Sequence, residues 1–215
     1  QPRSRGLGDV YKRQGIKRAR TLVTAAEHSI GNTEAPRSAR KEIRNLLEDY
    51  EGYKKRMDEL MEEIEKTLSE IPYIDKLMEI NGIGIKAVSC FIAEVGDIGR
   101  FDNPKQVQKL AGYAIVADSS GKHKGESRIS HRGRTRLRYA LYEATISVIG
   151  KNKEFKEIHS YYRTREKNPL KKMQSVIAVA CKLIRIFYTI LTKGVDYDGQ
   201  KMLNDIVRPE IQPAA

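Results

Sequence analysis

A basic loop that begins with two adjacent serines contains the residue types best suited to chemistry. Residues 119–138, SSGKHKGESRISHRGRTRLR, hold seven lysines and arginines and one acid, Glu126. The cations are Lys122, Lys124, Arg128, Arg132, Arg134, Arg136 and Arg138, with His123 and His131 among them. Guanidinium groups stay charged and can bind two phosphoryl oxygens at once. This composition favours a phosphate-binding site, and a merely solvated basic loop is the alternative.

The two serines add a possible nucleophile to this loop. Ser119 and Ser120 precede Gly121, at the point where the run of cations begins. A serine hydroxyl attacks a phosphodiester only if its proton is removed and the developing negative charge is stabilised. The neighbouring arginines could supply that stabilisation. The residue types therefore fit a covalent phosphoseryl step, although composition alone is weak support for one.

A second pattern, INGIGIKAVSCFIAEVG at residues 80–96, is typical of a helix-hairpin-helix module. Gly82 and Gly84 permit backbone conformations that other residues avoid, and they leave the following amides uncovered. Amides at the start of a helix attract phosphate oxygens, and Lys86 would add a cation. The pattern predicts sequence-independent contact with a nucleic-acid backbone. An ordinary turn between two helices, with glycine used for geometry alone, is the alternative.

Composition limits the class of protein. The net charge is +12, and 40% of the residues are hydrophobic. A surface this positive favours a polyanionic partner, most often a phosphate backbone, although acidic proteins are an alternative. We expect no membrane segment and no secretory signal, because apolar runs are short and the N-terminus is basic without a hydrophobic region. Cys90 and Cys181 lie in apolar helical contexts, which predicts buried free thiols in a reducing cytoplasm.

The elements that would carry these motifs read as helices. A heptad repeat on an otherwise charged segment predicts a coiled-coil arm, with a helix packed on its own domain as the alternative. Its apolar positions are Ile43, Leu46, Tyr50, Tyr53, Met57, Leu60, Ile64, Thr67 and Ile71. A short helix is expected at 15–30, a turn at 31–36, and further helical segments around 85–95, 107–113, 135–149 and 170–191. The fold class is therefore mostly α: a long coiled-coil arm, then a compact helical domain with the hairpin element and the basic loop.

Around the basic loop the sequence resembles the Piv-like transposases and DNA invertases of the insertion-sequence 110 group. That family shows A-G-L, S-G-K, G, I-S-K-R-G and L-R-x-A-L-Y in order. The matching residues are Ala111-Gly112, Ser120-Gly121-Lys122, Gly125, Ile129-Ser130, Arg132-Gly133, Leu137-Arg138 and Ala140-Leu141-Tyr142. The upstream run from Ile80 to Phe101 and the segment around Asn168-Pro169 are also similar to the family. Tyr113 stands where leucine is usual, and His131 replaces a common lysine.

The resemblance implies an activity and a set of partners. Family members combine a RuvC-like domain, whose four acidic residues bind divalent metal, with a coiled coil and a C-terminal domain whose serine bonds covalently to DNA. The serine before Gly-Lys matches, so Ser120 is the implied nucleophile and Ser119 the competitor. The implied partners are DNA, a second copy of the chain through the coiled coil and, as in some members, a structured guide RNA. Magnesium is expected in a separate N-terminal domain, and no cofactor in this chain.

From the motifs and the resemblance together we predict five parts. Residues 1–14 are expected to be disordered or non-native, 15–36 the end of a truncated upstream region, 37–72 the coiled-coil arm, 73–194 the C-terminal transposase domain and 195–215 a tail. The predicted DNA-binding residues are Gly82, Gly84, Lys86, Lys122, Lys124, Arg128, Arg132, Arg134 and Arg138. The leading hypothesis is a part of a cytoplasmic, nucleoid-associated bacterial or archaeal transposase that is inactive by itself. The alternative is a non-catalytic nucleic-acid-binding and dimerisation module.

Overall fold

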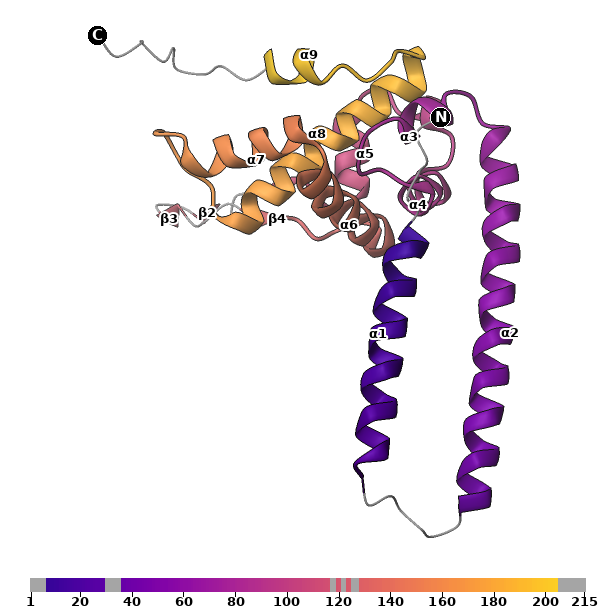
Figure 1. Cartoon of the computed structure of the whole chain (residues 1–215). Helices are drawn as coiled ribbons and strands as arrows, with labels where there is room; N and C mark the ends of the chain where they lie inside the picture. Colours follow the sequence, from indigo (N-terminus) through magenta and orange to yellow (C-terminus); the bar gives the residue numbers. More distant parts are fainter. Residues whose placement is uncertain (1–6, 30–35, 117–118, 121–122, 125–127, 205–215) are drawn as a thin grey trace. The chain divides into compact units, whose positions relative to one another are not determined.

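The computed structural model describes residues 7–29, 36–116, 119–120, 123–124 and 128–204 (Figure 1). Helices dominate this part of the chain, which confirms the predicted mostly-α class. The helices are α1 (Leu7–Glu27), α2 (Pro36–Ser69), α3 (Ile74–Met78), α4 (Ile85–Val95), the 3-10 helix η1 (Ile98–Arg100), α5 (Pro104–Leu110), α6 (Thr135–Lys151), α7 (Lys153–Thr164), α8 (Lys172–Lys193) and α9 (Gly199–Asn204). The strands are β1 (Ile115–Val116), β2 (Ser119–Ser120), β3 (His123–Lys124) and β4 (Arg128–Ile129).

The chain divides into two compact units, residues 1–58 and 59–215. The first unit contains α1 and the greater part of α2. Helix α1 begins at Leu7 and so includes residues 7–14, which were expected to be disordered or non-native. The turn predicted at 31–36 falls mostly outside the described residues, although Pro36 is the first residue of α2. Proline suits this position because the first amide of a helix has no partner within the helix.

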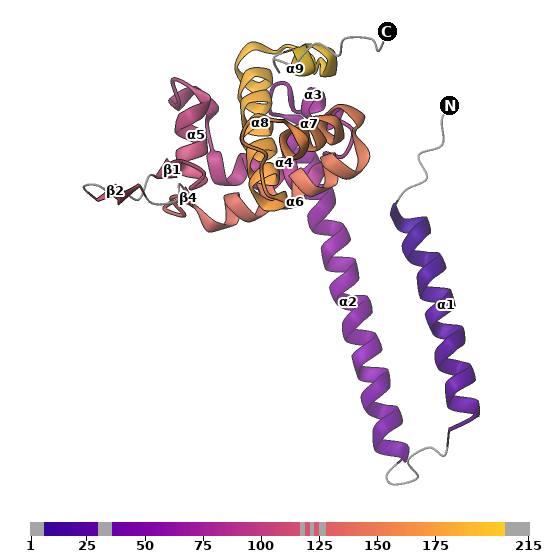
Figure 2. The same ribbon diagram turned by 90° about the vertical axis from the view of Figure 1, so that its left-hand side faces the viewer.

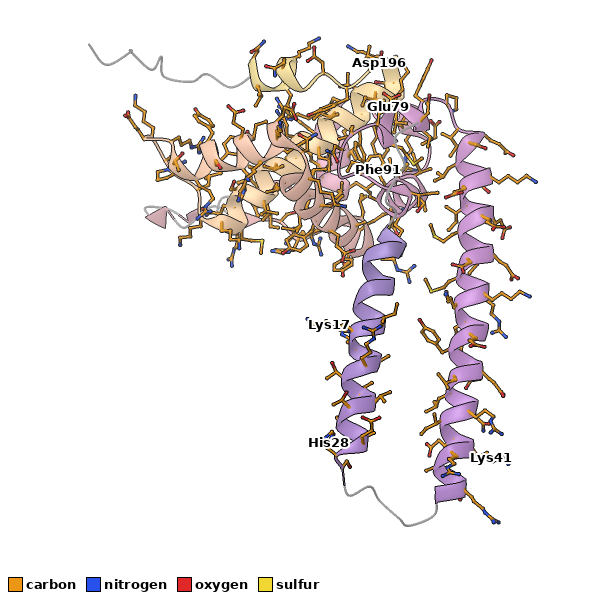
Figure 3. All side chains as sticks on the ribbon, viewed as in Figure 1. Lys17, His28, Lys41, Glu79, Phe91 and Asp196 are labelled. Atoms are coloured by element: carbon orange, nitrogen blue, oxygen red, sulfur yellow. The ribbon has the colours of Figure 1, made fainter. Side chains whose placement is uncertain are left out.

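The predicted heptad seam lies on α2 and is open to solvent. Its apolar side chains from Ile43 to Leu60 are each more than half exposed. Figure 3 draws the side chains along both helices, including Lys17 and His28 on α1 and Lys41 on α2. An exposed row of large apolar residues at heptad spacing suits a partner helix. The coiled coil itself therefore stays a prediction.

The last turns of α2 belong to the second unit and depart from the heptad pattern. Leu68 is buried and Ile64 packs against the core, whereas Thr67 is exposed and donates a hydrogen bond to the carbonyl of Glu63. Leu68, which is not a predicted seam position, therefore faces the core, and Thr67, which is one, faces solvent. A straight helix that meets a domain surface follows a period of 3.6 residues, and the seam shifts accordingly. The two units divide within α2, between residues 58 and 59. The predicted boundary after residue 72 stays a prediction.

The core of the second unit forms where α4, α6, α7 and α8 pack together. Phe91 of α4 meets Phe187 of α8 edge to face, with ring centroids 5.0 Å apart. Figure 3 places Phe91 inside this helical domain. Edge-to-face contact suits the charge distribution of aromatic rings and adds to the stabilisation from burial. These helices form the scaffold on which the basic loop and the glycine-containing turn are mounted.

Helix α8 is the one described helix that is long and apolar enough to cross a membrane. Its apolar residues are used in the core, however. Val179, Leu183, Ile184 and Phe187 are essentially inaccessible to solvent. The helix ends at Gly194, whose φ of 60° is the left-handed conformation favoured by glycine after a helix. Burial within the domain accounts for the apolar character of α8, as expected for a core helix.

Helix α7 was missed in the sequence, although it has a clear start. Asn152 ends α6 and begins α7 at once, and its side chain accepts a hydrogen bond from the amide of Phe155. Asparagine is a preferred residue at this position because its oxygen replaces a missing helical acceptor. In the same unit, Lys76 of α3 forms an ion pair with Asp196, with 2.6 Å between Nζ and Oδ1. Asp196 and Glu79 are labelled near each other in Figure 3, where the chain after α8 passes α3.

Candidate nucleic-acid interface

The described ends of the basic loop are joined by backbone hydrogen bonds. Strands β1 and β4 pair antiparallel, with Ile115 opposite Ile129. Ser130 donates to the carbonyl of Ala114 at 2.7 Å, and Arg134 donates to that of Leu110 at 2.8 Å. We call residues 110–116 and 128–138 the loop base. Backbone hydrogen bonds at several levels therefore hold the two sides together, where β1 and β4 lie next to each other (Figure 2).

Two glycines allow the sides of the loop base to approach closely. A Cβ on Gly133 would lie 2.4 Å from the carbonyl oxygen of Leu110 and 2.6 Å from the amide of Gly112. Gly112 itself has a φ of 77°, a conformation that L-residues avoid. Both glycines match the family motif noted in the sequence. Their structural role is to let one backbone segment cross directly over the other.

Arg138 acts within the loop base as an internal clamp. Its guanidinium donates to the carbonyls of Ala111 and His131, each at 3.2 Å, and these two carbonyls belong to opposite sides of the base. The side chain is half-buried. In return, the carbonyl of Arg138 accepts a hydrogen bond from the Tyr113 hydroxyl at 3.0 Å. Arg138 was predicted to bind phosphate, and in this structure it holds protein carbonyls.

Tyr113 stands where leucine is usual in the family, and its contacts in the structure account for the difference. Its side chain is 4% exposed, and burial is the main reason why its pKa is raised above the ordinary value. A buried tyrosine hydroxyl needs a partner, and the carbonyl of Arg138 provides one. The Tyr113 hydroxyl therefore forms a hydrogen bond with the first turn of α6, which a leucine side chain could not form.

Arg134 has a similar internal role one helical turn earlier. Its guanidinium donates to the carbonyl of Glu94 at 2.6 Å and lies 3.6 Å from that residue's carboxylate. This contact ties the start of α6 to the end of α4. About half of the Arg134 side chain is still exposed, at 48%. It is held in place by Glu94 and keeps an accessible face.

Besides Arg134, the exposed cations of the loop base are Arg128, Arg132 and Arg136. Arg132 follows His131, whose φ of 53° turns the chain between strand β4 and α6. Arg136 lies near Cys90, whose pKa is raised by burial and by Glu94 and lowered in part by Arg136. These side chains face solvent at the foot of the loop, where phosphate groups could reach them.

The predicted nucleophiles lie at the edge of what the structure describes. Ser119 and Ser120 form strand β2, which pairs antiparallel with His123 and Lys124 in β3. The register sets Ser120 opposite His123. Only the backbone of these residues is described, so the side chains of Ser119, Ser120 and Lys124 fall outside the description, as does Lys122 altogether. The assignment of the nucleophile stays a prediction.

The glycine-containing turn lies between α3 and α4. Gly82 has a φ of 101°, and a Cβ there would come within 2.9 Å of the Val148 backbone in α6. Gly84 is extended and exposed, with open space where a Cβ would stand. The amides after it begin α4 and, like all first-turn amides, lack partners within the helix. Lys86 is exposed beside them. The two glycines therefore differ: Gly82 serves packing, and Gly84 leaves the helix start accessible.

Sequence reasoning missed the partners that fix these arginines. Glu94 and the carbonyls of Ala111 and His131 carried no recognisable signal, because backbone acceptors are not visible in a sequence. The spacing of Arg134 and Arg138, one helical turn apart on an expected helix, was the available hint that they share a face. Within the described ranges, no group of three or more histidines, cysteines or acids is placed to hold a metal ion.

Comparisons with known proteins agree with the motifs. Residues 74–162 match the family model of the transposase IS116/IS110/IS902 family. The chain is 28% identical to a protein named "Putative transposase y4rJ" of Sinorhizobium fredii, over 62% of the chain and 34% of that protein. It is 30% identical to the pilin gene-inverting proteins of Moraxella bovis and Moraxella lacunata, over 57% of the chain and 38% of each relative.

These matches span little more than a third of the length of each relative. The matched family segment includes the glycine-containing turn, the loop base and α6. The family match and the named relatives together confirm the resemblance that the motifs indicated: residues 74–162 are similar to the transposases of the IS116/IS110/IS902 family.

Proposed function

We propose that this chain binds DNA through the basic loop and the glycine-containing turn, and supplies Ser120 as a nucleophile for DNA strand cleavage and transfer. The family supports a role in transposition or recombination. The observation that supports the proposal is the loop base, whose two sides are joined by backbone hydrogen bonds and whose second side, residues 128–138, carries exposed arginines. Catalysis of phosphoryl transfer depends mainly on such positioning and on charge stabilisation.

In the proposed step, the Ser120 Oγ forms a bond to a backbone phosphorus as its proton leaves to a base. The bond from that phosphorus to one sugar oxygen breaks, and the sugar leaves as a hydroxyl after gaining a proton. Arginine side chains would neutralise the charge on the remaining phosphoryl oxygens. Reversal of this step on a second strand would complete transfer. Arg132 and Arg136, which are exposed, suit this role better than Arg138, which holds protein carbonyls.

The relatives indicate the kind of reaction. The names of two of them say that they invert pilin genes, and inversion requires cleavage and rejoining of DNA. The metal, the guide RNA and the second copy implied by the resemblance are part of the same proposal.

A recombination assay tests the proposal. Ser120→Ala and Ser119→Ala would be compared in the chain supplied with a metal-binding domain of a family member and a DNA substrate bearing element ends. We expect Ser120→Ala to abolish recombination while DNA binding is retained, and Ser119→Ala to recombine. If only Ser119→Ala lost recombination, the nucleophile would be Ser119 instead of Ser120. Full activity of both variants would refute the serine mechanism and leave a binding and dimerisation module.

A further inference from the structure

A second group of cations lies away from the basic loop, where α7 turns into α8. Residues 163–172 contain five cations and one acid, Glu166. We call this group the α7–α8 patch: Arg163, Arg165, Lys167, Lys171 and Lys172. All of these except Arg165 are exposed, and Arg165 is half-exposed. Neither the family motifs nor the proposed catalytic step makes use of them.

The turn that carries the patch is ordered by local contacts. Leu170 donates a backbone hydrogen bond to the carbonyl of Tyr162, which closes the turn, and Asn168 adopts a positive φ of 56°. Arg165 donates from Nε to the carbonyl of Asn168 at 2.8 Å and lies over the Tyr162 ring. Arg165 therefore shapes the turn, and the other four cations project from it.

The four projecting cations lack compensation within the described part of the chain. None of Arg163, Lys167, Lys171 and Lys172 forms an ion pair with a described carboxylate. Two of them face the same histidine: the pKa of His159 is lowered by burial first and then by Arg163 and Lys172. Arg163 of α7 and Lys172 of α8 are thus both close enough to act on His159.

This arrangement is unfavourable for the folded chain alone. Lys171 and Lys172 stand at the first residues of a 22-residue helix, whose first turn contains no acidic residue. The start of a helix carries partial positive charge, so cations there reduce stability and acids would increase it. The same helix places Lys193 in its last turn, where a cation is favourable. A bound polyanion would remove the penalty at the start of α8.

From this uncompensated patch we propose that the α7–α8 turn is a second DNA-binding surface, which contacts the phosphate backbone of duplex DNA independently of its base sequence. The proposal rests on the proposed function of the chain in DNA binding. In Figures 1 and 2 the first turn of α8 is the end of that helix nearer to strand β4. A duplex held at the basic loop could therefore continue along the patch. Its flexible lysines suit phosphate contact, which requires charge more than fixed geometry.

Charge reversal at the start of α8 tests the proposal, and a matched reversal at the end of α8 and in α9 is the control. The patch variant is Lys171→Glu/Lys172→Glu, and the control is Lys193→Glu/Lys201→Glu, which changes the net charge equally. Binding of the full chain to a fluorescent duplex of random sequence would be measured by anisotropy from low to moderate salt, and thermal unfolding would be measured in parallel. Each lost phosphate contact should reduce the salt slope of log K by about 0.9.

We expect the patch variant to bind DNA at least tenfold more weakly at low salt, with a smaller salt slope and a raised Tm. The control should bind nearly as wild type and have a lowered Tm, because a favourable cation at the end of α8 is lost. Duplex binding should also raise the pKa of His159 in wild-type protein, followed by NMR, as the bound phosphates offset Arg163 and Lys172.

Equal affinity of the patch variant and the control would overturn the proposal. If Arg132→Glu/Arg136→Glu also weakens binding in that case, the proposed function of the basic loop stands alone. If the wild-type chain does not bind duplex DNA at all, both ideas fail. Binding of wild-type protein to vesicles of anionic phospholipid, lost in the patch variant without any change in DNA affinity, would assign the patch to a membrane surface and refute the proposal.

Discussion

The loop base and the α7–α8 patch are both rich in lysine and arginine, but these side chains have different contacts in the two regions. In the loop base, Arg134 and Arg138 donate to the carbonyls of Glu94, Ala111 and His131, and so connect separate segments of the domain. In the patch, Arg165 alone among the five cations has such a contact, and the other four are exposed along the end of α7, the turn and the start of α8. A count of positive charges does not distinguish arginines that build a site from cations that are available to a ligand.

The largest expected effect comes from the closest backbone approach in the loop base. Gly133→Ala places a Cβ against backbone atoms of Leu110 and Gly112, which cannot move without breaking the backbone bonds of the loop base. We expect a loss of about 3 kcal/mol in the free energy of unfolding, at the upper end for overpacking. Urea denaturation followed by circular dichroism measures it.

Gly150→Ala is the matched control for that change. Gly150 is a helical residue of α6 with open space where a Cβ would stand. Alanine should stabilise the helix by up to about 1 kcal/mol, because glycine is the more flexible residue in the unfolded chain. A Gly133→Ala variant as stable as this control would mean that the two sides of the loop base are not in close contact.

Removal of a clamp should cost more stability than removal of a patch cation. Arg138→Ala leaves two carbonyls of the loop base without their donor, and we expect a loss of about 1–3 kcal/mol. Arg163→Ala should change the free energy of unfolding by no more than about 0.5 kcal/mol, as for a surface substitution without a partner. Both are measured by urea denaturation. Equal effects of the two substitutions would contradict the distinction between the regions.

Arg132 should separate binding from stability within the loop base itself. Its side chain is exposed, so Arg132→Ala should leave the unfolding midpoint unchanged. We expect duplex affinity to fall severalfold with a salt slope smaller by about one, as for the loss of one phosphate contact. Fluorescence anisotropy over a range of salt concentrations provides the comparison with Arg138→Ala, which should affect stability and binding together.

The smallest expected effect is a pH dependence at the patch. The pKa of His159 is lowered, so between that value and the ordinary value of 6.5 the unfolded chain binds more protons than the folded chain. The contribution of His159 to stability is full above pH 6.5 and is lost as the pH falls through its folded pKa. Urea denaturation at a series of pH values should show that the free energy of unfolding falls less on acidification in His159→Gln than in the wild-type chain. If NMR gave His159 in the folded chain a pKa at or above 6.5, burial and the neighbouring cations Arg163 and Lys172 would not be acting on this histidine as described.

Periodicity and start signals allowed most helices of the second unit to be predicted. The apolar pattern of residues 170–191 gave α8 to within two residues at each end, because a core helix is apolar on a wide face. Helix α7 was missed because its charged residues dominate the pattern and its start signal, Asn152, directly follows α6. The strands within the basic loop were also missed, since two-residue strands leave no alternation to detect.

The candidate site was only partly predictable. Its location followed from composition and from the family motifs, and it lies within the segment that matches the family model. The roles of individual arginines did not follow, because they depend on backbone carbonyls brought together by the fold. For the same reason the sequence did not show that the two glycines of the turn have different surroundings: Gly82 lies close to the backbone of α6, whereas Gly84 faces open space.

The most direct measurement of the central claim is the site of a covalent DNA adduct. The chain, together with a metal-binding domain of a family member, would be incubated with a suicide duplex that traps the cleaved intermediate, and the adduct would be mapped by peptide mass spectrometry. We predict a phosphoester on Ser120 that is absent from Ser120→Ala and present in Ser119→Ala. Recombination of an intact substrate without any serine adduct would contradict the account.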